Sequence, residues 1–238
     1  MIAVEHPYVS AGHTDTGKVR RLNEDAILVR DDLGLWVVAD GLGGHSAGDF
    51  ASSLIVERLG ALSREGDVAD FIESIEDALE QVNHELLLRA RSLHVDLIGS
   101  TVVVLVYDRD FMLCGWVGDS RAYGMNGGRL RQLTRDHVQG PREDVTQFGN
   151  APSGGGALTR AVGAQETLLI DWIVSETRAG MPFLLCTDGI NKEIPDAELD
   201  LECRRLDEPD ALLRRLFDLA LGRAARDNVS AVVVRVQG

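Results

Sequence analysis

Three aspartates beside apolar, strand-like runs are the residues of this chain best suited to chemistry. Asp40 ends "LWVVAD", Asp188 ends "FLLCTD", and Asp227 lies just before the apolar run of "RDNVSAVVVRV". A carboxylate at the end of a buried strand is costly unless it is solvated, paired with a cation or bound to a metal. Asp-Gly also forms turns, and for either Asp-Gly pair alone we favour the turn. Three such positions in one chain favour a shared carboxylate cluster.

Two further acidic positions could join this cluster. Glu24 and Asp25 are adjacent in "RRLNEDA", and Asp119 lies in "CGWVGDSRAY". Carboxylate oxygens are the ligands that magnesium and manganese prefer, and no Cys or His spacing typical of a zinc site competes with them. The sequence therefore predicts a magnesium or manganese site.

Short strands and three helices are the elements that must position these carboxylates. Apolar residues at helical spacing predict helices within 47–59, 72–90 and 212–220, with Asp67 as the N-cap of the second. The order of strands, two helices, strands, one helix and a strand lacks strict βαβα alternation and indicates a layered α+β domain. The predicted strands are rich in Val, Leu, Ile or aromatic residues and bounded by Gly, Asp or Asn: "YVSAGH", "AILV", "LWVVA", "TVVVLVY", "FMLCGWVG", "SRAYGM", "LLIDWIV", "FLLCT" and "VSAVVVRV".

The stretch from His137 to Arg160 differs from the rest of the chain. It has little periodicity, two prolines and three successive glycines, and this composition predicts a flexible surface flap at about 137–160. We find neither an internal repeat nor a second domain. We therefore expect residues 1–238 to form one domain, with its core at about 9–236.

Composition narrows the classes of partner and compartment. Lys and Arg number 24 against 38 Asp and Glu, a formal net charge of −14, which disfavours nucleic acid and anionic membranes as partners. The N-terminus lacks the pattern of a secretory signal, and the longest apolar run, 102–107, is too short to span a bilayer. Three widely spaced cysteines predict neither a disulfide framework nor a zinc knuckle. We expect a cytoplasmic monomer.

The sequence partly matches two motifs of phosphate-binding enzymes, the P-loop and the cysteine-phosphatase loop. "GHTDTGKV" has the glycine and lysine spacing of a P-loop, but Val19 stands where Ser or Thr would hold magnesium, and a strand-like run follows instead of a helix. A cysteine-based phosphatase needs Cys, five residues and Arg. That spacing leads from Cys114 to Ser120 and from Cys186 to Lys192. We reject a cysteine-based phosphatase and disfavour a P-loop.

Eight segments in order resemble the signature blocks of the metal-dependent serine/threonine protein phosphatases, the PPM or type-2C family. The resemblance extends from about Ser10 to Val236, nearly the whole chain. Many eukaryotic members have a histidine directly after the Asp-Gly of the second segment. Leu42 replaces it here, as a residue other than histidine does in many bacterial relatives. The segments are "RRLNEDA", "VVADGLGGHSAG", "GSTVVVL", "GWVGDSRAY", "LTRDH", "LTRAVG", "LLCTDGI" and "RDNVSAVVV".

The resemblance implies a fold and a metal site. The fold would be α+β, a four-layer sandwich of two central antiparallel β-sheets flanked by α-helices. By matching positions, Asp40 would bridge two Mn²⁺ or Mg²⁺ ions and the Gly41 carbonyl would ligate one of them. Asp188 and Asp227 would hold the other ion, and Glu24 would act directly or through water.

The resemblance also implies an activity, the hydrolysis of phosphoserine and phosphothreonine by metal-activated water. Asp119 matches the ligand of a third, weaker ion, and Arg20 matches the arginine that grips the phosphoryl oxygens. Arg21 is not chosen, because one step along a strand turns a side chain to the other face. His45 matches a histidine of less certain role, and a helix-start residue bonded to backbone is an equal interpretation.

The predicted activity implies partners for the protein, and one alternative function stays open. Phosphoserine and phosphothreonine proteins would be the substrates, and the reaction implies an opposing serine/threonine kinase. A catalytically weak phosphatase fold that serves as a binding or regulatory module stays open. Partner binding that resists a chelator, without turnover, would support that module. Asn23 and Asn228 are expected to hydrogen-bond the backbone and shape the ligand loops.

Overall fold

The computed structural model describes residues 6–43, 47–139 and 157–237. His45 and most of the expected flap, residues 140–156, lie outside the described residues. The prediction of a flap therefore stays a prediction.

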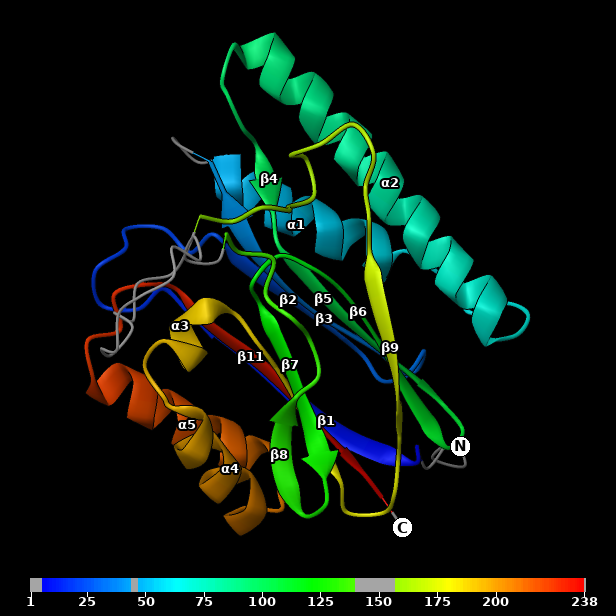
Figure 1. Ribbon diagram of the computed structural model, residues 1–238, viewed down its shortest axis with the longest axis vertical. Helices are drawn as coiled ribbons and strands as arrows, with labels where there is room; N and C mark the ends of the chain where they lie inside the picture. Colours follow the sequence, from blue (N-terminus) through cyan, green and yellow to red (C-terminus); the bar gives the residue numbers. More distant parts are fainter. Residues whose placement is uncertain (1–5, 44–46, 140–156, 238) are drawn as a thin grey trace, which may run out of the picture.

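Two antiparallel sheets form the centre of the molecule (Figure 1). One sheet has the strand order β1 (Tyr8–Asp15), β11 (Val229–Val236), β10 (Pro182–Cys186), β7 (Arg121–Asn126) and β8 (Arg129–Gln132). The other has the order β2 (Asp25–Arg30), β3 (Leu35–Leu42), β5 (Val102–Asp108), β6 (Phe111–Val117) and β9 (Asp171–Glu176), with β4 (Gly99–Ser100) paired to β3.

Helices cover the outer face of each sheet. α1 (Ala47–Gly60) and α2 (Val68–Leu93) pack on the second sheet, while α4 (Asp196–Arg205) and α5 (Pro209–Gly222) pack on the first (Figure 1). A third apolar cluster lies between the sheets and includes Trp36, Val103 and Phe183. The four layers confirm the predicted α+β sandwich.

The central strands have two buried faces, which explains their nearly continuous apolar sequence. In β3, Leu35, Val37 and Ala39 belong to the cluster under α1 and α2. Trp36 and Val38, the residues between them, belong to the cluster between the sheets. Side chains of a strand alternate between its faces, so a strand covered on both sides needs apolar residues at every position.

Local sequence signals predicted the longer helices correctly. The three periodic segments correspond to α1, α2 and α5. Asp67 caps α2 as expected, because its side chain accepts from the N–H groups of Ala69 and Asp70 at 2.8 and 3.1 Å. Asp70 in turn accepts from the Asp67 N–H at 3.0 Å and completes a capping box.

Three short elements and one helix were not predicted. They are β4, β8, the one-turn helix α3 (Asp188–Asn191) and α4. In α4, the apolar residues Ala197, Leu199, Leu201 and Cys203 recur at every second position, a spacing typical of a strand. The helix forms nevertheless, and only Leu199 and Cys203 among these four are buried against the neighbouring layer.

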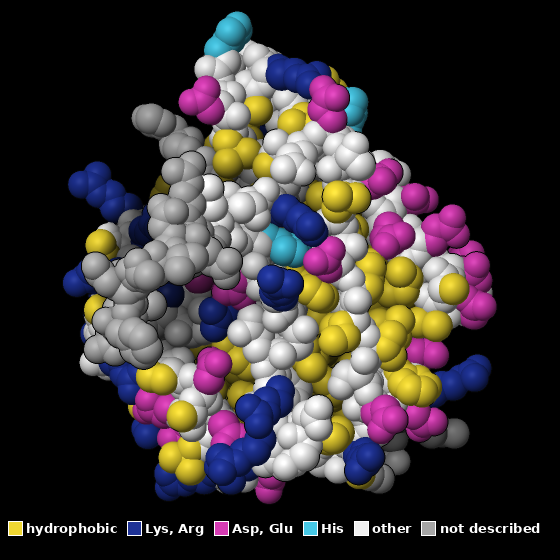
Figure 2. Space-filling view, in the orientation of Figure 1, with side chains coloured by type: hydrophobic (Ala, Val, Ile, Leu, Met, Phe, Trp, Pro, Cys, Tyr) yellow, Lys and Arg dark blue, Asp and Glu magenta, His cyan; other side chains and the backbone are white. Residues whose placement is uncertain are grey.

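Part of the acidic surplus lies on one helix. Acidic side chains gather over α2, where Glu73, Asp77 and Glu80 are exposed (Figure 2). Among the described residues, no helix combines the length and the apolar character needed to cross a membrane.

Candidate active site

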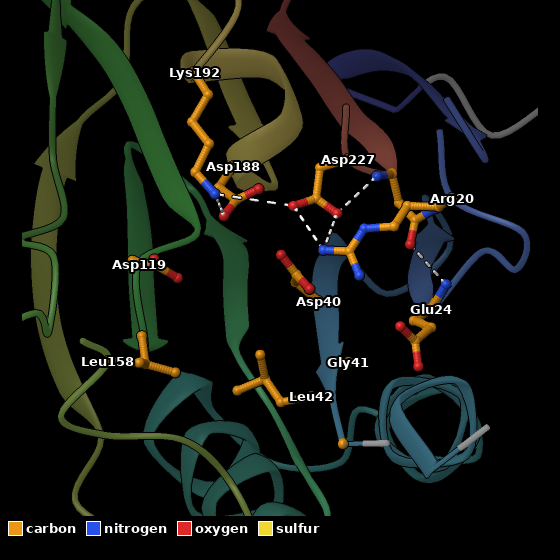
Figure 3. Close-up of a pocket in the computed structure, with 12 residues that line it drawn as sticks. Arg20, Glu24, Asp40, Gly41, Leu42, Asp119, Leu158, Asp188, Lys192 and Asp227 are labelled. Atoms are coloured by element: carbon orange, nitrogen blue, oxygen red, sulfur yellow. Dashed lines mark hydrogen bonds and ion pairs between the residues drawn. The ribbon is translucent and has the colours of Figure 1, made fainter. Parts of the chain in front are cut away.

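One cavity at the edge where the two sheets meet contains every residue of the predicted site. Its volume is about 290 Å³ (Figure 3). The residues that line it come from six separate parts of the chain: Arg20, Glu24, Asp40, Gly41, Leu42, Gly43, Asp119, Leu158, Asp188, Lys192, Asp227 and Asn228. Tertiary structure therefore brings together the acidic residues that the sequence keeps far apart.

The backbone of Asp40, and not its side chain, is hydrogen-bonded to the neighbouring segment. Its N–H donates to Thr101 Oγ1 at 3.1 Å, and its carbonyl accepts from the Thr101 N–H at 2.9 Å and from Ser100 Oγ at 3.0 Å. These bonds leave the carboxylate free to face the cavity.

Gly41 lies where only a glycine fits. A Cβ at this position would be 2.0 Å from the carbonyl oxygen of Gly48 in α1 and 2.6 Å from that of Glu24. The Gly41 N–H donates to the Glu24 carbonyl at 3.0 Å. The close approach joins β3, α1 and the loop before β2 at the cavity wall, so the glycine of "ADGLGG" has a packing role here beyond any turn.

Asn228 fastens the loop that carries Arg20 and Glu24. Its Oδ1 accepts from the Glu24 N–H at 2.9 Å, and its Nδ2 donates to the carbonyls of Thr16 and Leu22, both at 2.9 Å. This is the backbone-bonding role expected from the sequence.

The stretch "GHTDTGKV" lies at the end of β1 and in the turn that follows, and no helix begins there. Gly17 adopts a φ of 76°, and a Cβ there would lie 2.2 Å from the Asp227 carbonyl oxygen. The two glycines therefore serve strand and turn packing, and the P-loop interpretation is excluded.

Burial and mutual repulsion disfavour full ionisation of the carboxylates. Burial raises the pKa of Asp40 well above its ordinary value, and the nearby Asp25, Asp188 and Asp227 raise it further. Burial likewise raises the pKa values of Glu24, Asp119 and Asp188. Cations bound here would relieve this cost, since they favour the ionised forms.

Asp188 gives the most direct sign that the cavity suits a cation. It follows β10 and begins α3, and its Oδ1 is buried with no hydrogen-bond partner. A buried carboxylate oxygen without a partner is costly, and a divalent ion would satisfy it. The donor set therefore fits hard metal ions in chemical type.

Two cations of the chain itself occupy this acidic space. Arg20 Nη2 lies 2.9 Å from Asp227 Oδ1, and Lys192 pairs with Asp188 and lies 3.9 Å from Asp227 (Figure 3). In the parts of the chain that the structure describes, no three Asp, Glu, His or Cys side chains are arranged to hold an ion by themselves. An ion bound to Asp227 would therefore compete with Arg20, whereas Asp188 Oδ1 is not engaged by Lys192.

Lys192 is the cavity residue that the sequence reasoning missed. It lies four residues after Asp188, and α3 places the two side chains together. The sequence offered it only as the residue that stands where a cysteine-based phosphatase would need Arg. A helical turn after the Asp-Gly step would have been the signal, but a helix of this length has no periodicity to reveal it.

Asp25 lies beneath the cavity and does not line it. It is directly opposite Asp40 in the β2–β3 pairing and accepts from Thr187 Oγ1 at 2.8 Å and Ser230 Oγ at 2.6 Å. Burial raises the pKa of Asp25 to about 7, while these hydroxyls oppose the rise. Its bonds join β2 to β11 and to the residue between β10 and α3 under the site.

His137 also lies outside the cavity, next to the turn that carries Asp119. The Gly118 N–H donates to His137 Nδ1 at 3.1 Å, and His137 Nε2 lies 3.1 Å from Asp171. Arg160 lies 3.0 Å from the other Asp171 oxygen. His137 therefore acts as a structural link between the Asp119 turn and β9.

Comparisons with known proteins agree with this fold and identify its family. The model of the family "Protein phosphatase 2C" matches residues 12–231. The serine/threonine phosphatase stp of Listeria innocua is 32% identical over 204 residues, 79% of each chain. The serine/threonine protein phosphatase PstP of Mycobacterium tuberculosis is 30% identical over 237 residues, 95% of this chain and 44% of PstP.

Solved structures of related proteins have the same fold. PppA, described as a key regulatory component of T6SS in Pseudomonas aeruginosa, has a TM-score of 0.86 and 39% identity over 96% of this chain and 97% of its own. The catalytic domain of PstP in complex with two manganese ions has a TM-score of 0.82 and 26% identity, over 97% and 99%.

Layered sheets that open on an acidic cavity, together with these matches, define a metal-dependent phosphoprotein hydrolase. The chain belongs to the protein phosphatase 2C family and is a serine/threonine protein phosphatase.

Proposed function

We propose that the residues of this cavity carry the phosphatase reaction. Asp40 and the Gly41 carbonyl, with Asp188, Asp227 and Glu24, would hold two Mn²⁺ or Mg²⁺ ions. The observation that carries the assignment is the buried, unpartnered Asp188 Oδ1 within this group of carboxylates. Bound ions supply a water of lowered pKa and neutralise phosphoryl oxygens.

Arg20 is the proposed substrate-binding residue. Its side chain is 48% exposed at the cavity and directed by the ion pair with Asp227 (Figure 3). A guanidinium can donate two parallel hydrogen bonds to a phosphoryl group, which orients phosphorus for in-line attack. Arg21 does not line the cavity.

Proton donation to the leaving serine or threonine oxygen is assigned to water. Leu42 occupies the position after Asp40-Gly41, and the described lining of the cavity includes no histidine. The apolar side chains of Leu42 and Leu158 form one wall and offer no proton.

The physiological setting is proposed from the reaction and composition. Phosphoserine and phosphothreonine proteins are the substrates, an opposing serine/threonine kinase supplies them, and a monomer in the cytoplasm carries out the reaction. The three cysteines are free and buried, in keeping with a reducing compartment. We also propose that residues 1–238 work as one catalytic domain, with a flap at about 137–160.

Hydrolysis of an aryl phosphate and of a phosphothreonine peptide, with manganese and with chelator, tests the assignment. We expect metal-dependent turnover by the wild type and near-complete loss in Asp188→Ala with its circular dichroism retained. Asp32→Ala, at an exposed carboxylate paired with Arg30, is the matched control and should keep its activity. Full activity of Asp188→Ala would falsify the assignment, and activity that survives chelation would remove the metal from it.

A further inference from the structure

Lys192 is unusual in this chain because lysine is rare. The sequence contains two lysines, Lys18 and Lys192, so nearly all of its 24 basic residues are arginines. Lys192 lies in the acidic cavity, with its side chain half exposed. A lysine ammonium is a compact charge on a flexible stem, whereas a guanidinium is planar and larger. It can therefore fit a space suited to a metal ion.

The two oxygens of Asp188 have different environments. Lys192 Nζ contacts Oδ2, while Oδ1 is buried without a partner. Asp188 can therefore give Oδ1 to one divalent ion and keep Oδ2 on the ammonium. A second ion on the Oδ2 side would have to displace this ion pair.

The Oδ2 side of Asp188 is also the side on which Asp119 enters the cavity. In Figure 3, Asp119 projects into the cavity from the turn before β7, on the side of Lys192 and of the Asp188 oxygen that Lys192 contacts. Burial raises the pKa of Asp119, Asp188 adds to the rise, and the Lys192 ammonium opposes it. Lys192 thus already balances the charge of both aspartates.

We infer that the Lys192 ammonium takes the place that a third divalent ion would occupy between Asp188 and Asp119, so that this phosphatase binds two ions. The inference rests on the metal site of the proposed function. It also revises the expectation that Asp119 holds a third ion. A tethered charge does not depend on metal concentration, and it repels any further cation placed a few ångströms away.

Counting bound Mn²⁺ by equilibrium dialysis, with free Mn²⁺ measured by electron paramagnetic resonance, tests this directly. We expect two equivalents for the wild type and one further equivalent for Lys192→Gln. If the mutant's third ion is at Asp119, the double mutant Lys192→Gln/Asp119→Asn should return to two. Lys192→Arg, which keeps the charge, should also bind two.

Lys18→Gln is the matched control, since it removes the same charge from the only other lysine. Lys18 is exposed, and its Nζ donates to the Arg223 carbonyl at 2.9 Å. This variant should bind two ions. The weakest of the first two ions should also bind Lys192→Gln about tenfold more tightly than wild type, the scale expected for charges a few ångströms apart, and Lys18→Gln should show no such change.

Each other outcome has a distinct meaning. Three ions in the wild type, or two in Lys192→Gln with unchanged affinity, would overturn the role of Lys192 and leave the two-ion site intact. No bound ion in the wild type would overturn the proposed metal site and the inference together. If circular dichroism shows that Lys192→Gln is unfolded, the single mutant Asp119→Asn serves as the test. It should bind as many ions as the wild type. Loss of one ion in Asp119→Asn would contradict the inference.

Discussion

Arg20 and Arg21 are adjacent and chemically identical, yet only Arg20 reaches the cavity. The difference depends on the loop that Asn228 fastens and on the ion pair with Asp227, 2.9 Å long. At the scale of single residues, the site is therefore a balance of charges, in which an arginine and a lysine of the chain face five acidic side chains.

Replacement of Arg20 by Lys tests substrate binding. Loss of a bidentate, charge-assisted pair of hydrogen bonds costs about 1.5–3 kcal/mol, so kcat/KM should fall about 10- to 100-fold. The measurement is steady-state hydrolysis of an aryl phosphate with saturating manganese. Arg21→Lys is the paired control and should remain close to wild type. An unchanged kcat/KM in Arg20→Lys would show that a positive charge at this position is enough and that the guanidinium of Arg20 is not needed to bind the phosphoryl group.

At the scale of elements, Asp200 shows how the unpredicted β8 and α4 hold each other. Asp200 in α4 is 5% exposed, and it accepts from the Leu130 N–H at 2.7 Å and from Arg129 Nη1 at 2.9 Å. Arg204 lies 3.0 Å away. The backbone hydrogen bond from Leu130, together with these arginines, lowers the pKa of Asp200 although burial opposes it.

Asp200→Asn should destabilise the protein by about 1.5–3 kcal/mol at pH 7, the cost typical of hydrogen bonds to a charged group. Because the pKa of Asp200 is lower in the folded than in the unfolded protein, its carboxylate stabilises the fold above the unfolded pKa, near 3.8. That contribution is lost as the pH falls through the folded pKa. The difference from wild type should therefore shrink below about pH 4.

Urea unfolding of the metal-free protein between pH 7 and pH 3.5 measures this difference. The exposed Asp96→Asn variant controls for loss of a negative charge and should match the wild type. A difference for Asp200→Asn that is constant with pH would mean that the charge of Asp200 does not stabilise the β8–α4 contact.

At the scale of the whole molecule, the layers bury all three cysteines. Burial raises the pKa values of Cys114 and Cys203 to about 12 and also raises that of Cys186. Each belongs to an apolar cluster between layers, Cys114 between the sheets and the other two under α4 and α5. Buried thiols of this kind are poor nucleophiles.

The native protein should therefore react with almost no iodoacetamide at pH 8, whereas the denatured protein should take up three equivalents, one for each cysteine. Phosphatase activity should survive the native treatment. Mass spectrometry gives the number of modified cysteines, and aryl phosphate hydrolysis gives the activity. Rapid modification with parallel loss of activity would contradict both the burial and a reaction that needs no thiol.

Patterns within short stretches were enough to predict much of the fold. Runs with two buried faces, such as β3, and amphipathic segments, such as α2 with its Asp67 cap, identify their elements because the physical causes are local. α4 was missed because its apolar residues alternate as in a strand, and α3 because one turn has no period. The layered α+β class came from the order of the elements, and the five acidic candidates came from their residue type and setting. The four-layer sandwich, Arg20, Gly41 and the ligand roles came from eight motifs in family order.

By itself, the sequence determined the type of most elements, the acidic character of the site and the family. Only the tertiary structure decided which charges meet, namely that Arg20 pairs with Asp227, that Lys192 shares Asp188, and that Asp25 lies beneath the cavity. The physical reason is the distance along the chain over which each interaction acts. Strand and helix signals depend on residues only a few positions apart. The contacts at this site depend on strand order and register, which are set by packing between residues as far apart as Arg20 and Asp227.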